Sequence, residues 1–390
     1  MPGRREGAAA LLGGLWNAAS LVVVHAAARR FGWWRYDAAG GLFLGMPVDL
    51  YLGWAVLWGP VAVLGLARLP LAAVMAIMAA LDVVLMPLGH PVIRLGERWL
   101  GGEIVALVVA LLPSQLLARW TAEDRRLGAR VLMQAVLFVT LVLGVLPALI
   151  LDLTGTPLRL PRLSAPLVSI ALQLLALDAA LGLSALQEFY ARGAGTPLPY
   201  DPPRQLVTSG LYRYVRNPMQ VSMSILFVGA GLLLASWWVS AAGLVAAAYS
   251  AGLASWNEDE DLRARFGSDW TEYRRAVRAW WPRFSPYARP QGRIYVATSC
   301  RPCWSVGEWL LKRKPVALDV LPAETHPERD LERITYECDG APSPESGVAA
   351  FARALEHVNF GLAMAGALLR LPVVRGVVQF LVDSSGGGPR

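Results

Sequence analysis

The chain has 390 residues, of which 55% are hydrophobic and only 17% are charged, and its mean hydropathy is +0.43. These values exclude an average soluble globular protein. The formal net charge of +7 comes almost entirely from arginine, since Lys312 and Lys314 are the only lysines. In so apolar a chain this charge indicates the cytoplasmic loops of a membrane protein rather than nucleic-acid binding.

Apolar runs of membrane-spanning length recur through the first two thirds of the chain. A run of about 20 residues crosses a hydrocarbon core of about 30 Å. The charged N-terminus is followed by an apolar run without a clear small-residue cleavage site, so we expect a retained first helix and not a signal peptide. We predict eight spans, near residues 8–28, 49–67, 69–90, 103–119, 130–151, 164–186, 218–235 and 237–256.

The arginines predict how these spans are oriented. In an eight-span arrangement the loop at 119–130, the segment 192–216 and the tail after Asn257 share one side, which is the arginine-richer one. Because positively charged loops remain in the cytoplasm, we expect that side and both termini to be cytoplasmic. The expected location is a bacterial inner membrane.

Composition divides the chain into three sections. Residues 1–162 form a helical transmembrane block of unknown role, and residues 163–285 carry the dense polar motifs. Residues 286–390 begin within the breaker-rich segment Ser285–Arg293, after which the composition changes. The last section is long enough for a small separate domain. Its pattern predicts strands at 294–297, 316–321 and 333–337, and helices at 305–313, 347–357 and 360–371, an order that indicates a small α/β domain.

The middle section begins with an arginine-rich segment before an apolar hairpin. Pro202 and Pro203 keep the chain extended, and Pro218 suits the first turn of a helix, with Asn217 as its cap. The start of that helix, beside Arg216, is an expected anion site for a carboxylate or a phosphate.

An acidic cluster follows the hairpin, which turns near Ser236 and must return to the side of Arg216. The cluster is Glu258, Asp259, Glu260 and Asp261. These carboxylates cannot face lipid, because a charge in hydrocarbon costs several kcal/mol. They either form a solvated helix start, which the helix dipole favours, or pair with the arginines or a cationic ligand.

The order of these elements resembles the isoprenylcysteine carboxyl methyltransferase and phospholipid methyltransferase superfamily. The resemblance covers about residues 163–285 and is carried by GTPLPYDPPRQLVTSGLYRYVRNPM, a two-helix hairpin and EDEDLRARFGSDWTEYRRAVRAWWPRF. Its elements, in order, are L-V, G-x-Y, R-[HN]-P, an acidic pair, F-G and a closing aromatic-proline. The resemblance implies an S-adenosylmethionine-dependent methyltransferase whose active site lies at the cytosolic membrane face.

The same resemblance implies roles for individual residues. Asn217 stands where the family has the histidine of His-Pro, and Glu258 and Asp259 stand at the paired acids. Arg216 would meet the carboxylate of the cofactor or hold the acidic pair, and the implied catalytic residues are Arg216, Asn217 and Glu258. The implied cofactor-binding residues are Leu206, Val207, Tyr212, Asn217, Pro218, Met219, Gln220, Glu258 and Asp259.

Three departures from the family pattern affect the acceptor. Asn217 removes the imidazole base, Gln220 stands where the family has a tyrosine, and Ser255 stands where prenylcysteine enzymes have a substrate-binding arginine. A prenylcysteine carboxylate is therefore a less suitable substrate. We expect a lipid or another hydrophobic acceptor bearing a carboxylate, thiol, amine or hydroxyl.

Two aspartates lie inside apolar runs. Asp82 and Asp178 need polar partners there, either as structural hydrogen bonds between helices or as substrate or proton contacts in a cavity. Asp178 is the better functional candidate, because its span leads directly into the motif region.

The last section contains a C-x-x-C motif, Cys300-Arg301-Pro302-Cys303, after a strand and at the start of a helix. There the helix N-terminus and Arg301 would lower the pKa of a thiol and make Cys300 an attacking thiolate. A zinc site is disfavoured and no metal is expected, since Cys338 has no C-x-x-C partner and His326 stands alone.

This section resembles the DCC-type thioredoxin-like family in its strand–CxxC–helix start and in the closing G-V-A-A-F…L-P-V-V…GGGPR, although Ala297-Thr298-Ser299 stands where the usual aspartate would be. The expected fold is thus an all-α polytopic membrane protein with a small α/β thioredoxin-like C-terminal domain. The C-terminal section is either a thiol–disulfide exchange domain with a protein partner or a degenerate contact module.

Three functions remain open at this level. The first is a membrane methyltransferase fused to a putative thiol–disulfide oxidoreductase domain. The second is a membrane-anchored oxidoreductase whose methyltransferase-like part is only an anchor, and the third is a non-enzymatic scaffold or transporter.

Overall fold

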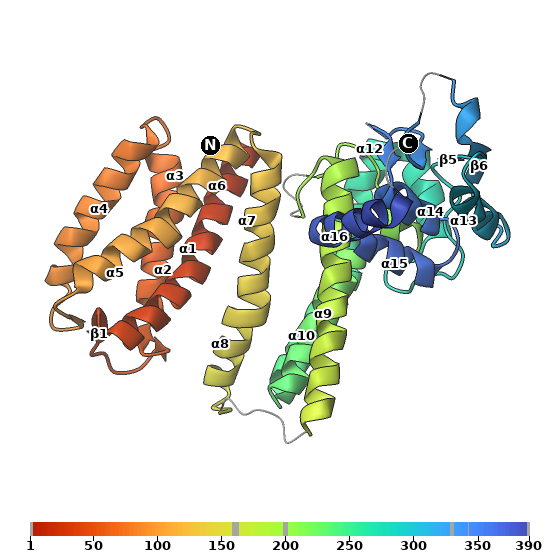
Figure 1. Ribbon diagram of the computed structural model, residues 1–390. Helices are drawn as coiled ribbons and strands as arrows, with labels where there is room; N and C mark the ends of the chain where they lie inside the picture. The colour runs from red at the N-terminus through yellow and green to blue at the C-terminus, as the bar shows by residue number, and fades with distance from the viewer. Residues whose placement is uncertain (1–2, 158–163, 198–201, 328–330, 342, 388–390) are drawn as a thin grey trace. The chain divides into compact units, whose positions relative to one another are not determined.

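A computed structural model describes residues 3–157, 164–197, 202–327, 331–341 and 343–387, with the side chains of these residues apart from 253–258, 302 and 386–387. The chain forms two compact units (Figure 1). The first comprises residues 1–160, 196–202 and 234–239, and the second comprises residues 161–195, 203–233 and 240–390.

The first unit is a bundle of apolar helices. These are α1 (Arg4–Phe31), α2 (Val48–Val56), α3 (Ala62–Gly65), α4 (Leu71–Leu88), α5 (Trp99–Ala106), α6 (Leu112–Ala122), α7 (Leu127–Val139) and α8 (Leu146–Leu153). π-Helical segments at Leu57–Val61, Leu107–Leu111 and Thr140–Val145 join α2 to α3, α5 to α6 and α7 to α8. Long, nearly continuous helices result, as expected where backbone groups must be paired within the membrane.

Small residues let α1 approach the π-helical segment at Leu57–Val61. Gly13 and Gly14 face Gly59, and a Cβ on Gly59 would lie 2.5 Å from the Gly14 backbone. Such close approach is typical of packing between membrane helices. The unit also has two short antiparallel pairs that the sequence did not predict, β1 (Trp34–Tyr36) with β4 (Ile93–Leu95) and β2 (Leu42–Phe43) with β3 (Met46–Pro47).

The second unit begins with two antiparallel helices, α9 (Ala165–Glu188), which continues as a π-helical segment to Gly193, and α10 (Pro218–Leu233). Gly182 meets Ser222, and Gly229 meets Leu175, so the two helices run in opposite directions along a close contact. After α11 (Trp237–Tyr249) and a π-helical segment at Ser250–Ala254, α12 (Ser255–Ala276) carries the acidic cluster. Gly267 interrupts α12 with a positive φ of 53°.

Among the residues that the structure describes, six helices are long and apolar enough to cross a membrane, so the prediction of a mostly helical membrane protein is confirmed. They are Arg4–Phe31, Val48–Gly65, Leu71–Leu88, Trp99–Ala122, Leu127–Leu153 and Ala165–Gly193. The predicted count of eight is not confirmed. The seventh predicted span corresponds to α10, of 16 residues, and the eighth to α11, of 13 residues, with its π-helical continuation to Ala254. At 1.5 Å per residue, 16 residues cover about 24 Å, less than the hydrocarbon core.

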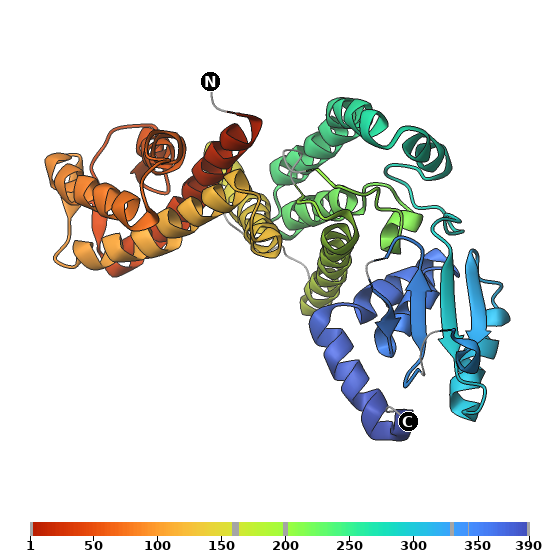
Figure 2. The same cartoon turned by 90° about the horizontal axis from the view of Figure 1, so that it is seen from above.

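The C-terminal part of the second unit contains a small sheet, as predicted (Figure 2). Its strands are β5 (Gly292–Val296), β6 (Leu318–Pro322), β7 (Thr335–Cys338) and β8 (Glu345–Ser346), in the order β6-β5-β7-β8. β5 and β6 are parallel and are connected through α13 (Arg301–Leu311), whereas β7 runs antiparallel to β5 and β8. The last helices are α14 (Val348–Leu355), α15 (Phe360–Leu369) and α16 (Pro372–Val382).

Candidate functional site

The G-x-Y part of the motif forms a short 3-10 helix, Gly210–Arg213, that is fully buried. Gly210 has a φ of +63°, which glycine adopts without strain, and a Cβ there would lie 3.2 Å from Cγ of Glu188. The backbone N–H of Gly210 donates to Oε2 of Glu356 at 2.8 Å. Glycine is therefore required both by the backbone conformation and by the close approach of α9.

Arg213 ties this turn to the segment after α12. Its guanidinium donates to the carbonyl oxygens of Tyr287 and Pro290, at 2.7 and 2.8 Å, and the Tyr287 N–H donates back to the Arg213 carbonyl at 3.0 Å. The Arg283 N–H donates to the carbonyl of Tyr214 at 2.9 Å. The closing aromatic-proline segment of the family motif is thus hydrogen-bonded to the G-x-Y turn.

The predicted cofactor-binding residues of the L-V and G-x-Y elements lie in two different places. Val207 and Tyr212, each 5% exposed, pack in an apolar cluster with Met219 and with Phe360 and Met364 of α15. Leu206 instead packs beside a cluster of α12 residues that includes Trp270 and Tyr273. A C-terminal helix therefore covers part of the predicted cofactor surface.

Leu206 also lines a cavity of about 600 Å³, a volume within the usual range for small-molecule sites. The cavity lies between the motif segment, α12 and the C-terminal sheet. Its lining includes Ser209, Asp269, Tyr287, Gln291 and Cys338. Leu206 is a predicted cofactor-binding residue, and the other predicted cofactor-binding residues whose side chains the structure describes do not line this cavity.

The structure brings Arg216 next to α12. Its guanidinium lies over the Trp270 ring, 5.2 Å from the centroid, and Nη1 donates to the Arg274 carbonyl at 3.4 Å. Backbone N–H groups of Arg216 and Asn217 donate to the carbonyls of Arg278 and Ala279, at 2.9 and 3.1 Å. These bonds hold the segment before Pro218, the first residue of α10, against the end of α12.

The acidic cluster lies on the same helix as these partners. Asp259 forms an ion pair with Arg274, and Asp261 forms one with Arg265 at 2.8 Å. Arg274 therefore connects Asp259 to Arg216, since its guanidinium pairs with Asp259 and its carbonyl accepts from Arg216. The side chains of Glu258 and Ser255 lie outside the described residues. Gln220 accepts a hydrogen bond on Oε1 from the Ser250 hydroxyl at 2.8 Å.

Both aspartates inside apolar runs have interhelical hydrogen bonds. Asp178 in α9 accepts from the Ser222 hydroxyl of α10 at 3.1 Å. Asp82 in α4, fully buried, accepts from Nε1 of Trp54 in α2 at 2.9 Å. These contacts are of the structural kind considered above, and each joins two helices.

A buried ionic network, not predicted from the sequence, lies behind the motif. Glu188 at the end of α9 binds Arg353 of α14 at 2.8 Å and Arg370 at 2.5 Å, and accepts a short hydrogen bond from Ser209. Glu356 binds Arg370 at 2.8 Å and Arg353 at 3.1 Å. Burial opposes the charge of Arg353, but Glu188 and Glu356 together raise its pKa well above the usual value. The network fastens the C-terminal helices to the motif.

The sequence contained a weak signal for this network. In the sequence, Glu188 and Arg353 are charged residues within or at the end of apolar helical segments. In the structure their side chains are 1% and 2% exposed. Such groups need partners, but their separation of 165 residues left the pairing undefined.

His357 lies next to this network. Its Nδ1 is 2.8 Å from the Val316 carbonyl, and its Nε2 is 2.9 Å from the Tyr336 hydroxyl and 3.3 Å from the Arg213 guanidinium. A carbonyl only accepts and a guanidinium only donates, so the neutral tautomer with a proton on Nδ1 satisfies all partners. Burial and the charge of Arg213 lower the pKa of His357 well below its usual value.

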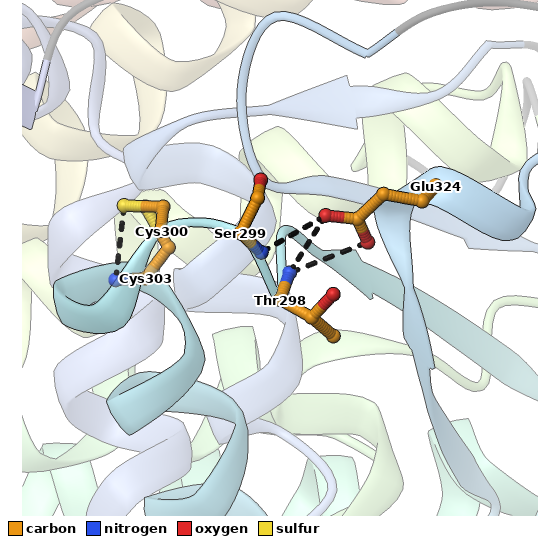
Figure 3. Close-up of a disulfide and its surroundings, with 5 residues drawn as sticks. All are labelled: Thr298, Ser299, Cys300, Cys303 and Glu324. Atoms are coloured by element: carbon orange, nitrogen blue, oxygen red, sulfur yellow. Dashed lines mark hydrogen bonds between the residues drawn. A yellow bond between two sulfur atoms is a disulfide. The ribbon is translucent and has the colours of Figure 1, made fainter.

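The C-x-x-C motif opens α13, as predicted (Figure 3). Cys300 is the N-cap residue, its Sγ accepts from the Cys303 N–H, and the two cysteines form a disulfide with Cα atoms 5.2 Å apart. The Glu324 carboxylate accepts from the N–H groups of Thr298 and Ser299, at 2.9 and 3.1 Å. Hydrogen bonds from its own backbone N–H and from Ser299 lower the pKa of Glu324 to about 2.

Neither His326 nor Cys338 forms a metal site with this motif. His326 lies 3.2 Å from Glu337, and Cys338 lies in β7 as a free thiol. Within the described ranges, no group of three or more His, Cys, Asp or Glu side chains could hold a metal ion.

Comparison with known proteins gives one family match. Residues 168–269 match the family model of phospholipid methyltransferase, a segment that includes α9, the motif, α10 and the acidic cluster. No curated protein and no solved structure matches the chain. The match supports the methyltransferase superfamily for this segment of an integral membrane protein.

Proposed function

We propose that the protein is an S-adenosylmethionine-dependent methyltransferase that acts on a lipid or another hydrophobic acceptor at the membrane surface. The observation that carries the proposal is the family match over residues 168–269. The gathering of Arg216, Trp270, Arg274 and Asp259 at the start of α10 supports it, because opposite charges and an aromatic face suit a zwitterionic, cationic ligand.

The residues fit this cofactor in part. Asp259 already holds a guanidinium and has 16% side-chain exposure, so its carboxylate can hold a cationic group. Leu206 offers an apolar wall to a cavity of suitable size. Val207, Tyr212 and Met219 pack with Phe360 and Met364, so their predicted contacts with the cofactor require a displacement of α15.

When bound, S-adenosylmethionine supplies a methyl group on a sulfonium centre. The residues of the chain then have to bind the cofactor, orient its methyl group towards the acceptor and exclude water from the site. In this proposal Arg216 and the start of α10 hold a carboxylate, Asp259 and Glu258 hold cationic or polar groups, and Pro218 and Gln220 shape the site. Asn217 offers an amide that can orient an acceptor, although it cannot act as an imidazole base.

The acceptor is proposed to arrive from the bilayer. Almost all apolar residues of α9 are exposed or half-buried, so this helix presents an apolar surface beside the motif. A nucleophile on a lipid-soluble molecule can reach the membrane boundary along such a surface. Mass spectrometry of membrane lipids and small thiols, with and without the protein, should reveal the acceptor as a mass increase of one methylene unit.

Calorimetry with S-adenosylhomocysteine tests the cofactor site on the full chain in detergent. Asp259→Asn should weaken binding by about tenfold or more, since a hydrogen bond to a charged group contributes about 1.5–3 kcal/mol. Glu258→Gln and Asn217→Ala should also weaken it. The matched control is Asp261→Asn, whose partner Arg265 lies one helical turn away on the surface. A folded sample that does not bind the ligand would overturn the proposal.

A second candidate function is thiol–disulfide exchange by the C-terminal part, proposed as a thioredoxin-like domain within residues 286–390. The disulfide at the start of α13 and the strand order β6-β5-β7-β8 support it. The Cys300–Cys303 disulfide would accept two electrons and two protons from a dithiol partner, which would itself become a disulfide. If exchange were the sole function, the methyltransferase-like part would be an anchor, and S-adenosylhomocysteine would not bind.

The remaining assignments also stay proposals. The motif side of the membrane and both termini are proposed to be cytoplasmic in a bacterial inner membrane. The sections 1–162 and 163–285 are proposed as a transmembrane block and a methyltransferase core.

A further inference from the structure

The last helix, α16, has an exposed apolar stripe. Val373, Val377, Phe380 and Leu381 are 78%, 56%, 71% and 57% exposed. Their spacing of four, three and one residues places all four on one side of the helix. On the other side, Gln379 accepts from the Val348 N–H at 2.8 Å and joins this helix to the start of α14. A stripe of this kind is unusual on a surface that faces water.

The start of α16 is fastened to the end of α9. Arg370, two residues before Pro372, binds Glu188 at 2.5 Å, and its carbonyl accepts from Nε2 of Gln187 at 3.2 Å. The chain bends by 87° between α15 and α16. The position of α16 relative to α9 is therefore set by buried polar contacts.

The membrane-length helix Ala165–Gly193 changes from apolar to charged residues near the end of α9. Gly182 meets Ser222 and Leu175 meets Gly229, and continuing this antiparallel register brings Glu188 level with Arg216. Arg216 begins the polar segment before α10. Residues 187–188 thus mark the height at which apolar helix surface gives way to charged groups, and α16 starts at that height. In Figures 1 and 2, α16 runs crosswise to α9 and away from it.

We propose that α16 is an interfacial helix that lies on the lipid bilayer, with Val373, Val377, Phe380 and Leu381 inserted between the headgroups and the acyl chains. A short helix with a single apolar side, a basic residue off that side and a position at the membrane boundary matches this mode of binding. Arg375 is the exposed basic residue, on the opposite side from Val377. A lipid surface is favoured over a second protein because the contacts of Arg370 with Glu188 and Gln187 place the start of α16 level with the end of α9 within each copy of the chain.

Depth-dependent fluorescence quenching tests this inference. Single cysteines are introduced as Phe380→Cys and, as the matched control, Arg375→Cys in a Cys338→Ser chain, where Cys300 and Cys303 are held in their disulfide. Each variant is labelled with a fluorophore and reconstituted in vesicles of phosphatidylcholine brominated near the top of its acyl chains. The label on Phe380→Cys should be quenched about twofold more than that on Arg375→Cys, because the apolar side inserts about 5–10 Å.

Aqueous iodide provides the complementary measurement and should quench the Arg375→Cys label more strongly. Equal lipid quenching at the two positions, or stronger iodide quenching at Phe380→Cys, would overturn the inference. Protection from both quenchers at Phe380→Cys would also overturn it, because it would indicate that protein covers the stripe. Both positions are exposed, so unchanged thermal unfolding of the variants verifies that the fold is intact. The measurement does not depend on methyltransferase activity.

Discussion

The carboxylate of Glu188, at the end of α9, lies 2.8 Å from the guanidinium of Arg353 in α14, and both side chains are almost completely buried. The pair joins a membrane helix of the methyltransferase-like segment to a helix of the C-terminal part. Ser209 contacts Glu188 of this network, and Gly210 contacts Glu356. The G-x-Y turn is therefore positioned in part by a residue that follows it by 146 positions in the chain. The C-terminal part is therefore structurally integrated with the motif.

Breaking this pair should strongly destabilise the second unit. Glu188→Gln leaves Arg353 buried without its principal partner, and we expect the free energy of unfolding to fall by about 3–5 kcal/mol. Chemical denaturation in detergent measures the change. Asp339→Asn, which breaks the exposed pair with Arg293, is the control and should cost about 0–1 kcal/mol. Similar losses in the two variants would contradict the role assigned to the network.

His357 should make stability depend on pH. Its pKa in the folded protein lies below the ordinary value of 6.5, so its contribution is complete above pH 6.5 and is lost as pH falls towards the folded pKa. Melting temperatures should therefore decrease on acidification below that point. His357→Gln lacks the titrating group and should have a lower melting temperature with a flatter dependence on pH. An unchanged slope in this variant would assign the effect to other groups.

Gly182 should be intolerant of a larger side chain. A Cβ at this position would lie 3.0 Å from Cβ of Ser222, so Gly182→Val must push α9 and α10 apart. We expect a loss of about 1–3 kcal/mol in unfolding free energy and a weaker Asp178–Ser222 hydrogen bond. Gly144→Val is a suitable control, because a Cβ there meets nothing within 4 Å. Equal effects would mean that helix propensity, not packing, accounts for the loss.

The two cysteines of the C-x-x-C motif should be recovered as a disulfide after purification in air. The chain has 3 cysteines, and Cys338 is free in the structure. A maleimide should therefore label one thiol in the denatured protein before reduction and all three after it, as counted by mass spectrometry. Cys300→Ser should release Cys303 and allow two labels without a reductant. Three labels on the unreduced wild-type chain would argue against the disulfide.

Local sequence patterns predicted a helix or strand correctly where a long apolar run or a helix-breaking residue marks its bounds. Apolar runs identified the six membrane-length helices, and the C-x-x-C between a strand and a helix was located correctly. The strands predicted at 294–297, 316–321 and 333–337 correspond to β5, β6 and β7 with shifts of one or two residues. The short pairs β1–β4 and β2–β3 were missed, because two or three residues are too few for a detectable alternation.

The side-chain contacts of the motif region could not be predicted from the sequence. Proline, glycine and charge spacing indicated that Arg216 and the acids return to one side, but not that Arg274 would bind Asp259 or that Trp270 would lie under Arg216. Residues Val207 and Tyr212 were expected at a cofactor surface, and nothing local indicated that α15 packs on them.

The sequence by itself determined a membrane protein with a methyltransferase-like polar segment and a C-x-x-C section, because hydropathy, helix breakers and motif order act over neighbouring residues. The tertiary structure decided which distant charges meet, which part of the motif is covered, and that α16 starts level with the end of α9. Those outcomes depend on packing between helices far apart in the chain, where burial makes each charge require a specific partner.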